Sequence, residues 1–82
     1  MASKAIGKNP ANITKSDATT YSPPYDGFVV DVDGDVKIRT PEGDDVTIPS
    51  CRAGIPYSFP FDILYSTGTA SGITTIAAYF VN

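Results

Sequence analysis

Histidine and tryptophan are absent from this sequence of 82 residues, and cysteine occurs once, at Cys51. Histidine is the usual general base and the commonest transition-metal ligand, so its absence disfavours most acid–base enzymes and most metal centres. A single cysteine allows no intrachain disulfide, so side-chain packing has to stabilise the fold. We therefore expect a protein that is not an enzyme and that uses no cofactor.

Long apolar segments are missing as well. No run approaches the roughly 18 apolar residues that a membrane-spanning helix needs. The opening segment, MASKAIGKNP, contains lysine but no apolar h-region before Pro10, which argues against a Sec-type export signal. We expect no membrane contact.

Charge is unevenly distributed along the chain, whose net charge is −3. Residues 1–25 contain Lys4, Lys8 and Lys15 against Asp17 alone, which gives +2 for this part and −5 for the remainder. A nucleic-acid-binding protein would have a basic body with clustered arginine and lysine. The pattern instead indicates a basic segment on an acidic body, and we expect no nucleic-acid partner.

Residues 1–25 are rich in serine, threonine, asparagine and proline, show no helical or alternating period, and end in SPPY. This composition predicts an extended N-terminal arm, with a disordered tail as the alternative. An arm of this kind would order against a neighbouring subunit if the protein assembles. Residues 26–82 are predicted to form the body.

Short alternating runs separated by turn residues fill the first half of the body. They predict three strands, in GFVVDV, DVKIRT and DVTIPS, joined as a meander by a two-residue Asp33-Gly34 hairpin and by a turn over residues 41–44. The residues expected to face the core are Phe28, Val30, Val32, Val36, Ile38, Val46 and Ile48.

The second half of the body contains two further β-rich segments. In YSFPFDILYS alternate residues are apolar, and Pro60 is expected to place part of this run at an edge or bulge. In ITTIAAYFVN both faces carry apolar residues, which predicts a strand covered twice. No segment has a capped helical period, so we expect an all-β fold: a small β-sandwich or barrel of about five or six antiparallel strands with an extended N-terminal arm.

A body of residues 26–82 is small for a domain without disulfides or a metal, and it is expected to be only marginally stable alone. Oligomerisation is the simplest remedy. We expect the oligomer interface to involve aromatic and apolar residues of the last two segments, namely Tyr57, Phe59, Ile76 and Phe80.

The stretch DVDGDVKI places Asp31, Asp33 and Asp35 at alternate positions, as in a calcium loop. An EF-hand loop needs glycine at its sixth position and an acidic residue at its twelfth. Counted from Asp31, Glu42 is twelfth, but the glycine is fourth, and the flanking segments read as strands. A hairpin is therefore the preferred interpretation, with the three aspartates as weak candidates for a cation site.

Cys51 beside Arg52 could be imagined as a reactive thiolate, but the sequence offers no histidine base and no second cysteine. Serine–histidine–aspartate catalysis is excluded for the same reason. We expect Cys51 to be a small packed residue at a strand end.

The order of several motifs resembles a known group of proteins. GDV at residues 34–36, the glycine turn at Gly43, VTI at 46–48, AG at 53–54 and the segment 67–79 follow one another as in small virion proteins of tailed phages, including the head-spike base of gene transfer agents. The resemblance covers roughly residues 16–80 and rests on turn and strand signals.

This resemblance implies a non-enzymatic structural protein: a small β-sandwich forming a homo-oligomer, trimer or pentamer, on the capsid surface of a virion and made in the host cytoplasm. Threefold symmetry would suit a capsid decoration protein, and fivefold symmetry a head-spike base. The implied partners are the major capsid protein and a spike or fibre protein, and no catalytic residue is carried over. The alternative is a monomeric carbohydrate- or calcium-binding β-module that uses its tyrosines or the three aspartates.

Overall fold

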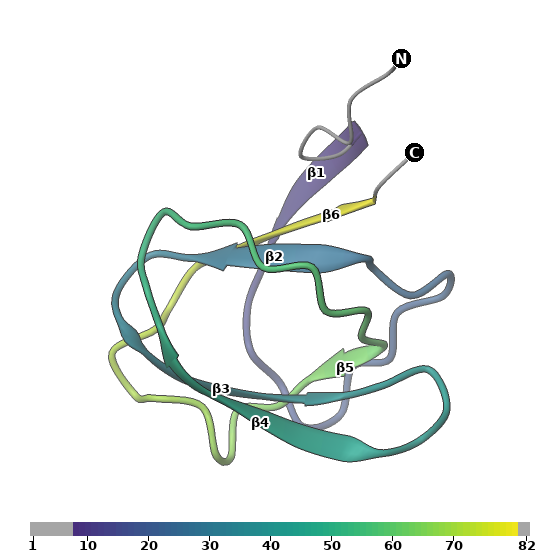
Figure 1. Ribbon diagram of the computed structural model, residues 1–82. Coiled ribbons are helices and arrows are strands. Elements are labelled where there is room, and N and C mark those ends of the chain that lie inside the picture. Colours follow the sequence, from purple (N-terminus) through teal and green to yellow (C-terminus); the bar gives the residue numbers. More distant parts are fainter. Residues whose placement is uncertain (1–7, 81–82) are drawn as a thin grey trace.

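The computed structural model describes residues 8–80, and in that range it contains strands and no helix (Figure 1). The strands are β1 (Lys8–Ile13), β2 (Gly27–Val30), β3 (Gly34–Arg39), β4 (Asp45–Cys51), β5 (Ile63–Leu64) and β6 (Ile76–Phe80). They form two antiparallel sheets, in the orders β1-β6-β2 and β4-β3-β5. The predicted all-β fold is confirmed, and of the two expected forms, sandwich and barrel, the structure has the one with two sheets. The described part of the chain has no helix suited to crossing a membrane.

The core lies between the two sheets, one above the other in Figure 1. Val36 and Ile38 face it from β3, as the alternation predicts, while Asp35, Lys37 and Arg39 alternate with them on the outer face. The largest fully buried side chains come from both sheets and from the segments between them: Phe28, Phe61, Ile38, Leu64, Ile73, Ile76, Val36 and Cys51.

The predicted three-stranded meander is wrong at its first join. β2 pairs with β6, and β3 pairs with β4 and β5, so the chain crosses from one sheet to the other at residues 31–33. A two-residue type I′ hairpin needs positive φ at both central residues, and neither Asp33 nor Gly34 has it. β2 consequently ends at Val30, and Val32, expected in the core, is 39% exposed.

The second join is a hairpin, as predicted. β3 and β4 pair from Arg39↔Asp45, next to the turn, to Gly34↔Cys51. The turn between them has Gly43 at φ 100°, a conformation that glycine adopts without steric cost. The Thr40 N–H donates to the Asp44 carbonyl oxygen at 2.8 Å and closes the turn. Near this turn Val46 is 39% exposed rather than buried, because β4 is the outermost strand of its sheet.

The aromatic run at residues 57–66 forms much less sheet than its period suggests. Only β5 pairs as a strand, with β3, while Tyr57 and Phe61 make isolated bridges to Phe28 and Tyr25. Pro60 lies between these bridges, and a proline there cannot donate to a ladder. The run therefore spans the gap between the sheets, linking the edge of β2 to the second sheet.

The described part of the predicted arm, residues 8–25, is extended but packs on the body. β1 pairs with β6, and beyond it the Ser16 N–H donates to the Leu64 carbonyl oxygen at 2.9 Å. Tyr21 and Tyr25 then pack their rings around Phe61, at centroid distances of 6.3 and 5.7 Å. Residues 8–25 thus complete one sheet and cover the open side of β5.

Candidate functional site

The three alternating aspartates each bind a different segment. Asp31 accepts hydrogen bonds from the Thr74 N–H at 3.2 Å and the Thr74 hydroxyl at 2.8 Å. Asp33 accepts from the Ala53 N–H at 2.8 Å, and Asp35 from the Ser50 N–H at 2.9 Å. The predicted Asp33-Gly34 hairpin would have placed Asp31 opposite Asp35, and it is wrong because the chain does not turn back there.

This geometry separates the carboxylates instead of converging them on one point. Within residues 8–80, no group of three or more histidine, cysteine, aspartate or glutamate side chains is placed to hold a metal ion. The Thr74 hydroxyl bond, the largest influence, lowers the pKa of Asp31 below its usual value. The DVDGD stretch therefore bonds to residues 74–75, to Ala53 and to Ser50 near the end of β4.

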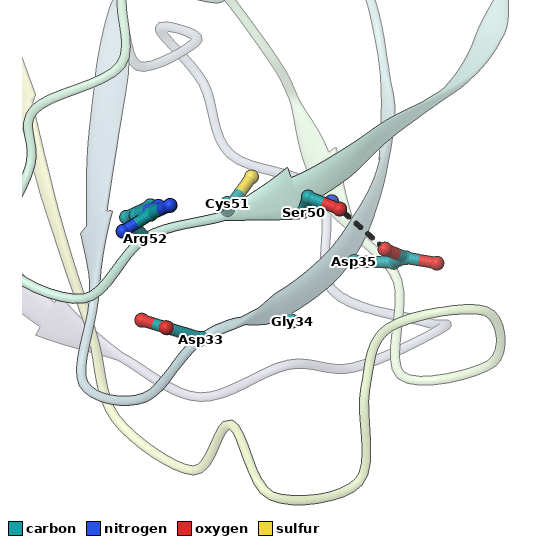
Figure 2. A pocket seen from close by; sticks show the side chains of 6 residues that line it. All are labelled: Asp33, Gly34, Asp35, Ser50, Cys51 and Arg52. Carbon is teal, nitrogen blue, oxygen red and sulfur yellow. Dashed lines mark hydrogen bonds between the residues drawn. The ribbon is translucent and has the colours of Figure 1, made fainter.

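A surface hollow lies where β3 begins and β4 ends, lined by Asp33, Gly34, Asp35, Ser50, Cys51 and Arg52. Figure 2 shows Asp35 bonded to Ser50 at one side and Asp33 and Arg52 toward the other. Ser50 has φ 55°, in the left-handed region that costs a non-glycine residue energy, and the Asp35 bond holds it there.

Cys51 lies in the wall of this hollow but turns its thiol inward. The side chain is buried, and Sγ donates to the Ile48 carbonyl oxygen at 3.6 Å. Burial raises the pKa of the Cys51 thiol above its usual value, so it stays protonated at neutral pH. This placement suits the packing role expected from the sequence and does not provide a nucleophile.

The residues expected at an oligomer interface have different environments. Ile76 is fully buried inside the subunit at 0% exposure, so its side chain offers nothing to a partner. Phe80 stacks on Tyr25 at 4.8 Å, and the Tyr57 carbonyl oxygen accepts from the Tyr79 hydroxyl at 2.9 Å. Phe59, at 40% exposure, is the most exposed member of the set.

Phe59 belongs to an exposed loop, residues 52–60, which also presents Ile55 at 50% exposure. Sequence reasoning missed Ile55, although its position between Gly54 and Pro56 indicates a loop. The loop is fixed to β2, because the Gly54 N–H donates to the Val30 carbonyl oxygen at 3.1 Å and Tyr57 exchanges two bonds with Phe28. The 52–60 loop is thus an apolar surface held in one shape.

Two further acidic residues also anchor loops. Asp17 accepts from the Ser66 and Thr67 N–H groups, each at 2.9 Å, and from the Thr67 hydroxyl at 2.6 Å, which lowers its pKa. Asp62 accepts two bonds from the Arg39 guanidinium, at 3.0 and 2.9 Å. Both carboxylates thus bond to segments far from them in the sequence.

Comparisons with known proteins give one informative result. No protein-family model and no curated protein sequence matches the chain. Among solved structures, a chain of the capsid of a native gene transfer agent particle, computed with C5 symmetry, is similar at a TM-score of 0.71 and 22% identity. The similarity covers 88% of this chain and 82% of that chain, so the two share a fold over nearly their whole length.

Proposed function

We propose that this protein is a non-enzymatic structural component of a phage-like particle, a homo-oligomeric capsid decoration protein or head-spike base at the virion surface. The observation that carries the proposal is the fold shared with a chain of a gene transfer agent capsid over 88% of the sequence. The order of sequence motifs resembles the same group of proteins, and this resemblance does not depend on the structure.

The exposed groups of the described chain fit a binding protein better than a catalyst. The 52–60 loop presents Ile55 and Phe59 to solvent on a backbone that is already fixed. A preformed apolar loop binds with little loss of conformational entropy. We propose that this loop contacts the major capsid protein or a spike or fibre protein.

The experiment that tests the proposal combines the native mass of the purified chain with binding to capsids. Light scattering across a concentration series should give a trimer, which suits shell decoration, or a pentamer, which suits a vertex base. Co-sedimentation should then show saturable binding to capsids of the phage-like particle whose genes include the one for this protein. A monomer that does not sediment with these capsids would refute the proposal.

A small calcium-binding module is the alternative from another class, motivated by the DVDGD stretch. Its three carboxylates already accept hydrogen bonds from three different segments, so an ion would have to break these bonds to gather them. We expect added calcium to leave the melting temperature unchanged. A saturable upward shift would favour the alternative.

A further inference from the structure

The two sheets together have four outer strands, and the fold covers two of them. The outer edge of β2 is bonded to the 52–60 loop through Phe28 and Tyr57. The outer edge of β5 is bonded to residues 16–21, through the N–H groups of Ser16 and Tyr21. Within the described residues, no pairing is present on the outer sides of β1 and β4. In the part of the chain that the structure describes, these two strands are the open edges.

The outward groups of β4 follow from its register with β3. The carbonyl oxygens of Lys37 and Arg39 accept bonds from Tyr65 and Asp62, so these residues of β3 face away from β4. Their partners across the ladder are Thr47 and Asp45, whose backbone groups therefore point to the open side. Unpaired strand groups of this kind readily accept another strand.

The two open edges differ in charge. Residues 40–50, which contain the turn and most of β4, include Glu42, Asp44 and Asp45 and no basic residue. Residues 1–13, which end with β1, include Lys4 and Lys8 and no acidic residue. Opposite charges across an interface favour association and fix its orientation.

The two edges also lie apart in space. Figure 1 shows β1 at the top of the molecule and β4 at the bottom, so one partner strand cannot occupy both edges of the same subunit. Each subunit thus has an acidic edge at one end and, at the other, the edge of β1, whose sequence contains Lys8 and no acidic residue. A contact between two different patches of identical chains is heterologous, and repeated heterologous contacts form rings when the rotation closes.

We propose that the outer edge of β4 and its acidic turn accept the β1 edge of a second copy of this chain, so that subunits assemble head to tail. This inference rests on the homo-oligomer of the proposed function and names the surfaces that would form it. The added strand would also cover part of the exposed side chain of Val46, because it would lie beside β4.

The test is a charge exchange within one chain, read as native mass at about 50 mM salt, where surface charges are weakly screened. Lys4→Glu with Lys8→Glu, and separately Glu42→Lys with Asp44→Lys, should each weaken assembly by about tenfold or more, because the two segments would then carry charges of the same sign. The chain carrying all four changes should assemble like the wild type. Ser71→Glu, at an exposed residue outside both edges and outside the 52–60 loop, is the control and should assemble normally.

A second variant tests strand pairing itself. Thr47→Pro removes an outward N–H of β4 and should abolish assembly, whereas Thr47→Val keeps the N–H and should not. Circular dichroism shows whether each variant folds, and if Thr47→Pro does not fold, the charge exchange alone decides.

The outcomes separate this inference from the proposed function. Loss of assembly in both charge-reversed chains and recovery in the chain with all four changes would support head-to-tail pairing. An oligomer that survives every variant, or a loss that the four changes do not repair, would overturn it while the homo-oligomer stands. A wild-type monomer at all concentrations would overturn it too, and capsid co-sedimentation would still decide the structural role.

Discussion

The change Gly34→Ala tests packing, because one contact decides whether it raises or lowers the free energy of unfolding. A Cβ at Gly34 would lie 2.5 Å from the Ala70 Cβ, and next 3.4 Å from Cδ1 of Ile73. The backbone of Gly34 is not left-handed, so alanine can adopt it without strain. At such a position glycine-to-alanine changes normally stabilise a protein by about 0.4–1 kcal/mol, because the unfolded chain loses freedom. The close Ala70 contact should reverse that gain.

The expected magnitude follows from two opposing effects. Overpacking a filled core usually costs about 1–3 kcal/mol, which exceeds the entropic gain, so Gly34→Ala should lower the free energy of unfolding by about 1–2 kcal/mol. A chain of 82 residues has roughly 4–12 kcal/mol of stability in total. Each 1 kcal/mol should lower the melting temperature by about 4–8 °C in a domain of this size.

Urea denaturation measures the effect, and two further variants locate its cause. Ala70→Gly removes the opposing Cβ, so Gly34→Ala combined with Ala70→Gly should recover most of the loss, with a coupling energy of about 1–2 kcal/mol. Gly72→Ala is the matched control, because its Cβ would lie 3.5 Å from Val32 Cγ2 in ordinary contact, and it should be neutral or slightly stabilising. A stabilised Gly34→Ala, or a double variant without coupling, would refute the packing argument.

Three other changes probe the core, the loop anchors and the proposed docking loop. Phe61→Ala should cost about 3–5 kcal/mol in urea denaturation, because Phe61 is fully buried, and Phe61→Leu should cost clearly less. Asp31 and Asp17 have lowered folded-state pKa values, mainly through threonine hydroxyl bonds, so the stability they add is present above about pH 4 and is lost as the pH falls through the lower folded values. Asp31→Asn should therefore flatten the fall of the denaturation midpoint between about pH 4 and pH 2, and an unchanged slope would contradict this. Phe59→Ser should leave the unfolding free energy within about 0.5 kcal/mol but weaken capsid co-sedimentation, unlike Ser58→Ala; equal binding by both variants would exclude Phe59 as a contact.

Local patterns in the sequence predicted local structure well. The alternation in GDVKIR gave the buried face of β3, and the residues PEGD gave the turn to β4, because both depend on neighbours along the chain. The sequence did not predict β1, because KNPANI has no alternation of apolar and polar residues. Its partner β6 lies at the other end of the sequence, and no local signal specifies such a pairing.

The Asp33-Gly34 pair does not form the predicted hairpin for a related reason. A hairpin there would need β2 and β3 to lie side by side, yet β2 is bonded to β6 on one side and to the 52–60 loop on the other. With both of its edges occupied, β2 has no place for β3, and the chain has to cross to the other sheet. The strength of the local turn signal could not reveal this competition.

The alternating aspartates make sense once the crossing is known. A chain that leaves one sheet and enters another passes segments whose N–H groups lack ladder partners, and aspartate side chains can accept hydrogen bonds from such groups. Asp31 supplies one at residues 74–75, just before β6, and Asp35 supplies one at Ser50, near the end of β4. One short segment thus bonds to both sheets. The alternate spacing of the three aspartates, which resembles that of a calcium loop, is explained by hydrogen bonding alone. The pH dependence of the stability of Asp31→Asn distinguishes an aspartate that accepts these hydrogen bonds from one that is only a surface charge.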